Sequence, residues 1–140
     1  MPCRLLLADD HEIVRRSLRE IIEMKTDCLV VAEAIDGLQA VQLAKEFAPD
    51  IVLVDISMPH LDGLDAARQI RQQNPQTKIL ILTMHDAAPL IAKIQETGVD
   101  GYLLKSDAPK GLPLAIDSLL RDKPYFAGSD EASFRPGPTS

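Results

Sequence analysis

The sequence contains few aromatic residues, no tryptophan and no long apolar run. Aromatic side chains make up 4% of its 140 residues, so we expect a core built from aliphatic side chains. No apolar run approaches the roughly 20 residues of a membrane-spanning helix, and the chain starts with a strand-like Leu5-Leu6-Leu7 run rather than a signal peptide. We therefore expect a cytoplasmic protein of one ordinary domain without a membrane partner.

Cysteine and basic charge are also scarce. Cys3 and Cys28 are the two cysteines, and each begins an apolar run, so the two can lie near each other on neighbouring strands. In a chain without an export signal, reduced thiols are favoured over a disulfide. The formal net charge of −6 argues against nucleic-acid binding by this chain itself, because such a surface needs a basic patch.

Five apolar runs alternate along the chain with five segments whose apolar residues recur at helical spacing. The expected strands cover residues 4–8, 28–34, 51–55, 78–83 and 99–104, and the expected helices cover residues 11–24, 36–47, 62–71, 87–97 and 108–121. The stretches between strands are long enough for helical crossovers, which indicates an α/β fold with a parallel sheet. The unbroken run Ile51-Val52-Leu53-Val54 is typical of a strand covered on both faces.

The character of the sequence changes near its end. From Pro124 on, proline, glycine and serine are mixed and the apolar period is lost, a composition typical of linkers and disordered segments. We therefore predict one domain over residues 1–122 and a linker or disordered tail over residues 123–140.

Polar side chains stand where several of the predicted strands end. They are Asp9 and Asp10 after the first strand, Asp55 at the end of the third, Thr83 at the end of the fourth and Lys105 after the fifth. In open parallel sheets, ligands bind outside the carboxyl ends of the strands, where the strand order reverses. We therefore expect these side chains, distant in sequence, to meet at one edge of the sheet.

Three carboxylates at one edge would repel each other, by about 4 kcal/mol for a pair 4 Å apart at an effective dielectric constant of 20. A hard divalent cation relieves this repulsion, and Mg²⁺ prefers such oxygen ligands. A lysine and a threonine hydroxyl beside a free carboxylate favour phosphoryl transfer to an aspartate. Taken singly, each residue has an ordinary explanation, such as a turn or cap role for Asp55; the combination favours a site.

Three histidines, His11, His60 and His85, also fall in loops at this edge. Together they offer the alternative of a softer metal. Their spacing matches no zinc-binding pattern, so we interpret them as solvated loop residues.

The combination resembles the receiver domain of bacterial two-component response regulators over residues 3–122. The resemblance rests on Asp9-Asp10, Asp55, Met58-Pro59 with Asp62-Gly63, Thr83, and Lys105 with Tyr102 three residues before it. It implies a flavodoxin-like, doubly wound sheet of five parallel strands in the order 2-1-3-4-5, with five helices.

The resemblance also implies roles for the carboxylates. Asp55 would accept a phosphoryl group from a sensor histidine kinase in a Mg²⁺-dependent reaction. Asp10, Asp55 and the main-chain carbonyl of Ser57 would hold the Mg²⁺ directly, and Asp9 would act through a bound water. The protein would then be no enzyme beyond catalysing its own phosphorylation and dephosphorylation.

Other residues receive roles from the same resemblance. Lys105 would contact the phosphoryl oxygens, Thr83 would swing its hydroxyl toward the phosphate, and Tyr102 would turn inward as Thr83 moves. Such a pair is a two-state element biased by local charge. Many receivers have a proline after this lysine, joined by a cis bond; Ser106 stands there in this sequence, which leaves the geometry open. Met84, bulky and next to Thr83, predicts slow hydrolysis of the phosphorylated form.

The local sequences D-D-H, L-T-M-H-D and G-Y-L-L-K resemble the NarL/FixJ (LuxR-type) subfamily, in which a helix-turn-helix DNA-binding domain follows the receiver. This sequence contains no such domain. It is either a natural single-domain regulator or a receiver cut from a longer transcription factor, and its Pro/Gly/Ser-rich end favours the second. DNA would then be contacted through the missing domain. Phosphorylation can also produce a homodimer, through the first and fifth helices or the fourth and fifth.

Two rival functions share the same residues. One is a Mg²⁺-dependent phosphohydrolase with an aspartate nucleophile; enzymes of the haloacid dehalogenase type usually carry a second aspartate two residues later, where this sequence has Ser57. The other is a receiver-like interaction module that never takes phosphate. Such modules usually lack an acidic, threonine or lysine position, and this sequence retains them all.

Overall fold

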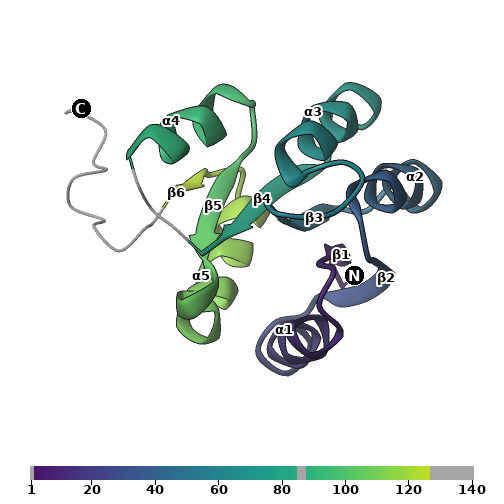
Figure 1. Ribbon diagram of the computed structural model, residues 1–140. Helices are drawn as coiled ribbons and strands as arrows, with labels where there is room; N and C mark the ends of the chain where they lie inside the picture. Colours follow the sequence, from purple (N-terminus) through teal and green to yellow (C-terminus); the bar gives the residue numbers. More distant parts are fainter. Residues whose placement is uncertain (1, 85–87, 127–140) are drawn as a thin grey trace.

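The computed structural model describes residues 2–84 and 88–126, which form a parallel sheet with helices on both faces (Figure 1). The strands lie in the order β2-β1-β3-β4-β5-β6. Their bounds are β1 Arg4–Ala8, β2 Leu29–Ala34, β3 Ile51–Asp55, β4 Lys78–Thr83, β5 Gly101–Leu104 and β6 Tyr125–Phe126. The first five strands confirm the predicted flavodoxin-like order.

Within the described ranges, five α-helices connect the strands. They are α1 Glu12–Lys25, α2 Gly37–Phe47, α3 Gly63–Gln73, α4 Ala88–Glu96 and α5 Ala108–Leu120, the last preceded by a 3₁₀ turn over Lys105–Asp107. Each lies within a few residues of its predicted bounds. In this part of the chain, no helix is both long and apolar enough to cross a membrane.

Successive strand residues face opposite sides, so each face of the sheet has its own apolar core. Leu5 and Leu7 of β1 belong to the core beneath α1 and α5, and Leu6 and Ala8 belong to the core beneath α2, α3 and α4 (Figure 1). β3 is buried along its whole length, as its apolar run predicted. Because helices cover both faces, a ligand has access to the sheet mainly at the strand ends.

The sheet has one strand more than predicted. β6 lies in the segment 123–140 that the sequence assigned to a linker or disordered tail, and it pairs with β5 in parallel. After α5 the chain turns at Asp122, whose φ is 61°, and Tyr125 N then donates to Asp100 O at 3.0 Å. A two-residue strand is too short to show a period of two, so the sequence pattern could not predict it. The rest of the predicted linker, 127–140, lies outside the described residues.

The two cysteines directly precede β1 and β2, where Leu29 N donates to the carbonyl of Cys3 at 2.7 Å. Cys3 and Cys28 are both buried free thiols in this structure. Contact with the Cys28 thiol, together with burial, raises the pKa of Cys3. A protonated, buried Cys3 behaves as a small apolar core residue.

The start of α3 fixes the loop that follows Asp55. A Cβ added at Gly63 would lie 2.2 Å from the carbonyl oxygen of Asp55 and 2.7 Å from Ile56 Cα, so glycine alone permits this close approach. Gly63 N donates to Ile56 O at 2.9 Å, and the Asp62 side chain caps the helix by accepting from Asp65 N. The loop of residues 56–62 is therefore closed tightly over the end of β3.

Candidate functional site

Four strand ends bring the predicted polar residues to one edge of the sheet. Asp55 is the last residue of β3 and Thr83 the last of β4, while Asp9 and Lys105 directly follow β1 and β5. Asp9, Asp55 and Thr83 are buried, with exposed fractions of 0%, 3% and 0%. Asp10, the next residue along from Asp9, is exposed. The predicted convergence of these residues is confirmed.

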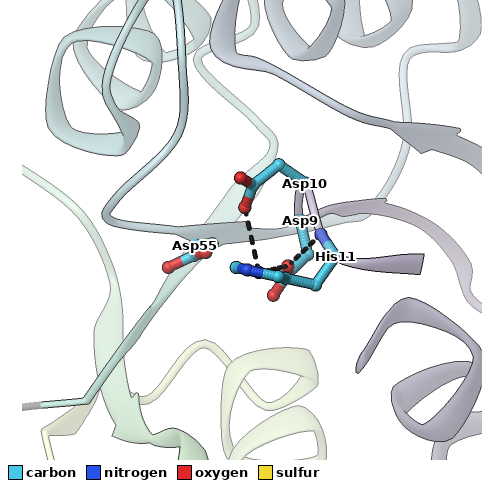
Figure 2. Close-up of side chains that lie close together, drawn as sticks. All are labelled: Asp9, Asp10, His11 and Asp55. Atoms are coloured by element: carbon cyan, nitrogen blue, oxygen red, sulfur yellow. Dashed lines mark hydrogen bonds and ion pairs between the residues drawn. The ribbon is translucent and has the colours of Figure 1, made fainter. Parts of the chain in front are cut away.

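The acidic residues form a compact cluster with a histidine. One possible ligand atom from each of Asp9, Asp10, His11 and Asp55 lies within 4.8 Å of the others (Figure 2). The Nδ1 atom of His11 lies 3.4 Å from Asp9 Oδ1 and 3.2 Å from Asp10 Oδ1. The side chain of His11 is 66% exposed, so it is solvated as predicted, but it also contacts the acidic pair, which we did not expect.

Lys105 supplies positive charge to this cluster. Its Nζ atom lies 3.0 Å from Asp9 Oδ2 and 3.0 Å from Asp55 Oδ2. Burial alone would lower the pKa of Lys105, but its contacts with the two carboxylates outweigh burial and raise that pKa. The described residues contain no cis peptide bond, so the bond from Lys105 to Ser106 is trans.

Burial is the main influence on the ionisation of Asp55. It raises the pKa of this carboxyl group, and the negative charge of Asp9 acts in the same direction. Hydrogen bonds from Lys105 and from Ser57 N, at 3.0 and 3.2 Å, oppose that rise without cancelling it. Burial therefore works against ionisation of Asp55, and a nearby cation would favour the charged carboxylate.

The residues present fit a hard divalent cation such as Mg²⁺. Asp9 Oδ2 is buried and has no hydrogen-bond partner among the described residues, although the Lys105 ammonium lies at ion-pair distance. Asp10 and Asp55 offer further carboxylate oxygens in the same cluster. A buried carboxylate oxygen that faces an ammonium group, beside two more acidic residues, belongs to the kind of oxygen donor set that Mg²⁺ prefers.

An open cleft of about 760 Å³ leads to this cluster. Its lining includes Asp10, Asp55, Thr83, Met84 and Lys105. A ligand entering the cleft therefore meets the acidic residues, the lysine and the threonine at the same point.

Tyr102 is buried in this structure, with an exposed fraction of 2%. The resemblance implied that its side chain turns inward as Thr83 moves, and that movement stays a prediction. The ring centroid of Tyr102 lies 6.2 Å from that of Phe126 in β6. Because β6 was not predicted, a second aromatic ring beside Tyr102 was not expected either.

Arg15 is a residue near the site that the sequence did not indicate. We placed it on the outer face of the first helix, but its Nη1 atom donates to the main-chain carbonyl of Asp9 at 2.9 Å. Its Nε atom also donates to Glu33 Oε1 at 3.0 Å. The position of an arginine on a charged helix face does not predict such contacts from the sequence.

Of the other two histidines, the structure describes His60, which lies away from the acidic cluster. His60 is 64% exposed and its Nδ1 atom lies 2.9 Å from Asp36 Oδ2 at the start of α2. His85 lies outside the described residues. The solvated-loop interpretation therefore holds for His60, which contacts one surface carboxylate.

Comparisons with known proteins show the family. The sequence matches the family described as "Response regulator receiver domain" over residues 5–117. It is 42% identical to "Response regulator UvrY" of Escherichia coli and 37% identical to "Transcriptional regulatory protein DegU" of Brevibacillus brevis, each over 123 residues. Both alignments cover 88% of this chain, but 56% and 52% of the two relatives. The chain thus spans about half the length of the curated relatives it matches.

Solved structures give the same result. A two-component response regulator of the LuxR family from an Aurantimonas species superposes with a TM-score of 0.88 at 39% identity, covering 95% of this chain and 94% of that one. The receiver domain of the stress response regulator RcsB from Escherichia coli superposes with a TM-score of 0.84 at 26% identity, covering 91% of this chain and 100% of that one.

The doubly wound sheet with an acidic edge is thus the architecture of a two-component receiver, a signalling module rather than a metabolic enzyme. The chain belongs to the response regulator receiver domain family, and within it to the LuxR-type regulators. The family match and the solved structures confirm the family that the motifs of the sequence resembled.

Proposed function

We propose that Asp55 accepts a phosphoryl group from the phosphohistidine of a sensor histidine kinase. The observation that carries this proposal is the position of Asp55, a buried carboxylate in one cluster with Asp9 and Asp10 and 3.0 Å from the Lys105 ammonium. A phosphate-independent interaction module has no need of this charge arrangement at the bottom of an open cleft. Membership of the receiver family supports the same role.

The site would hold Mg²⁺ through Asp10, Asp55 and the main-chain carbonyl of Ser57, with Asp9 acting through a water. When bound, the ion neutralises charge that develops on the transferring phosphoryl group. The protein's own part is to keep the carboxylates close together although they repel. It does so with the strand ends, which fix Asp55, and with Lys105, which contacts Asp9 and Asp55 at once.

The transfer itself needs one nucleophile. A carboxylate oxygen of Asp55 would form the O–P bond while the P–N bond to the kinase histidine breaks and its electron pair stays on the imidazole. Lys105, already beside Asp55 Oδ2, would contact the phosphoryl oxygens. Thr83 at the end of β4 would donate its hydroxyl to them. The aspartyl phosphate would be the product, so the protein assists its own phosphorylation and dephosphorylation.

We infer that the whole protein controls transcription and contacts DNA through a part outside this chain. One relative carries the name "Transcriptional regulatory protein DegU", and this chain spans about half of its length. The net charge of −6 supports a separate DNA-binding part, because an acidic surface repels phosphates. Phosphorylation would act on this output through a homodimer of receivers.

The test is to incubate the purified protein with a small acyl phosphate and Mg²⁺ and to measure its intact mass. We expect a gain of one phosphoryl group, lost when the metal is chelated and absent in Asp55→Asn. Asp65→Asn, an exposed acid on α3, is the matched control and should be phosphorylated like the unchanged protein.

Two outcomes would favour the rival functions instead. A protein that never gains the phosphoryl mass under these conditions is a phosphate-independent module. Many turnovers of a generic phosphomonoester, lost in Asp55→Asn, would indicate a phosphohydrolase. The serine at position 57 argues against this function, because it offers no carboxyl group as acid or base.

A further inference from the structure

We propose that Arg15 is a positioning residue for the acidic pair: by holding the main chain of Asp9, it sets where Asp9 and Asp10 meet the divalent cation. The proposal rests on the proposed function of the same site. Arg15 contacts neither Asp55 nor the cleft in the contacts described above, so it would act through Asp9 alone.

Every polar atom of Asp9 has a neighbour that fixes it. The main-chain N donates to Ala34 O at 3.1 Å, and the carbonyl accepts from Arg15 Nη1 at 2.9 Å. Oδ1 accepts from His11 N at 2.9 Å, and Oδ2 lies 3.0 Å from Lys105 Nζ. In this set, Arg15 is the side chain that holds the main chain at the point where Asp9 leads into Asp10.

Arg15 is itself held from the neighbouring strand. Its Nε donates to Glu33 Oε1 at 3.0 Å, and Glu33 Oε2 accepts from Arg19 at 2.7 Å. Burial would raise the pKa of Glu33, but the two arginines outweigh it and lower that pKa. Glu33 is therefore charged at neutral pH, and the Arg15 side chain is only 15% exposed. Both features favour a fixed guanidinium over a mobile surface side chain.

Such anchoring matters because of the ion's demands. Mg²⁺ requires near-ideal octahedral geometry and loses its waters reluctantly, so a displaced carboxylate weakens binding. Residues that orient ligands from outside the coordination shell typically change metal affinity by about 10- to 100-fold when mutated. Arginine suits this task, since its planar fork can contact Asp9 O and Glu33 together, whereas a lysine offers one point charge.

The experiment is a Mg²⁺ titration of the full chain, in which binding is measured by the NMR amide shifts of residues 8–12 or by calorimetry. We expect the Mg²⁺ dissociation constant to rise about 10-fold in Arg15→Gln, and to rise in Arg15→Lys and Glu33→Gln as well. In these variants, phosphorylation by an acyl phosphate should be slower than in the unchanged protein at low Mg²⁺ and equally fast at saturating Mg²⁺. The Mg²⁺ concentration for half-maximal rate should therefore rise while the maximal rate stays the same. A merely structural role would not change the first without the second.

The matched control is Arg16→Gln, the next residue on α1, which is 70% exposed and pairs with Glu12. It should bind Mg²⁺ like the unchanged protein. Equal dissociation constants in Arg15→Gln and Arg16→Gln overturn the proposal, as does a loss of folding stability in Arg15→Gln and Glu33→Gln with unchanged Mg²⁺ binding. If the unchanged protein binds Mg²⁺ but Asp55 takes no phosphate, the proposed function fails and the positioning role stands. If the unchanged protein binds no Mg²⁺, both fail.

Discussion

Lys105 lies between two buried carboxylates, so the stability of the protein in the absence of metal depends on its positive charge. In Lys105→Met, Asp9 and Asp55 lose their counter-charge, and we expect the free energy of unfolding to fall by about 3 kcal/mol at neutral pH. Mg²⁺ should then raise the stability of the variant more than that of the unchanged protein, because the ion replaces the missing charge. Urea unfolding with and without Mg²⁺ measures both effects.

The exposed Lys110 on α5 provides a control for this measurement. Lys110→Met should change the unfolding free energy by no more than about 0.5 kcal/mol and should leave the response to Mg²⁺ unchanged. If Lys105→Met behaves like Lys110→Met, the lysine does not neutralise the acidic cluster.

Asp55 gives the site a characteristic pH dependence in the absence of metal. Burial, with the Asp9 charge, raises the pKa of Asp55 above its ordinary value of 3.8. Above pH 3.8 the unfolded chain loses this proton while the folded protein still holds it, so the contribution of Asp55 to stability falls as pH rises through the raised pKa. Asp55→Asn has no titrating carboxyl group at this position, so it should not lose stability in this way as the pH rises.

Urea unfolding in chelator from pH 4 to pH 7 tests this prediction. We expect Asp55→Asn to gain stability over the unchanged protein progressively as the pH rises. The exposed Asp65→Asn should show no such trend. A difference between Asp55→Asn and the unchanged protein that stays constant with pH would contradict the burial of a charged carboxylate.

At the scale of elements, β6 depends on a glycine in the strand beside it. A Cβ at position 101 would lie 2.2 Å from the carbonyl oxygen of Tyr125 and 3.2 Å from Leu80 Cδ1. We expect Gly101→Ala to displace β6 and to lower the free energy of unfolding by about 1–3 kcal/mol. Hydrogen exchange should quicken at residues 123–126, since Tyr125 N loses its bond to Asp100 O.

Gly98→Ala separates this steric effect from general destabilisation. Gly98 has a φ of 82° and open space around it, so alanine there strains the backbone without touching β6. It should destabilise the protein while leaving exchange at residues 123–126 unchanged. If Gly101→Ala leaves that exchange unchanged too, β6 does not pack against β5 as described.

The elements show which sequence patterns can be trusted. β3 was predictable because a short unbroken apolar run that ends at a turn is typical of a strand covered on both faces. α1 was predictable because fourteen residues give several turns of a regular period. β6 was not, because two residues carry no period and a parallel pairing with β5 depends on tertiary contact. The contact between the rings of Tyr102 and Phe126 was missed with it.

At the scale of the whole molecule, the parallel topology explains why the site residues could be found without coordinates. Each strand ends at the same edge, so Asp9, Asp55, Thr83 and Lys105 had to converge once the order of elements was known. The contacts of Arg15 and His11 with this cluster were not predicted, because they depend on side-chain directions and a charged residue on a helix or loop usually faces solvent. Strand ends are therefore better predicted than the contacts that orient them.

The measurement that tests the central claim most directly is chemical mapping of the phosphorylated residue. The full chain is treated with an acyl phosphate and Mg²⁺, and the aspartyl phosphate is reduced with borohydride, which converts the modified aspartate to homoserine. Peptide sequencing by mass spectrometry should find homoserine at position 55 alone. Homoserine at position 9, 10 or any other acidic residue, or none in a sample whose intact mass shows the added phosphoryl group, would contradict the account.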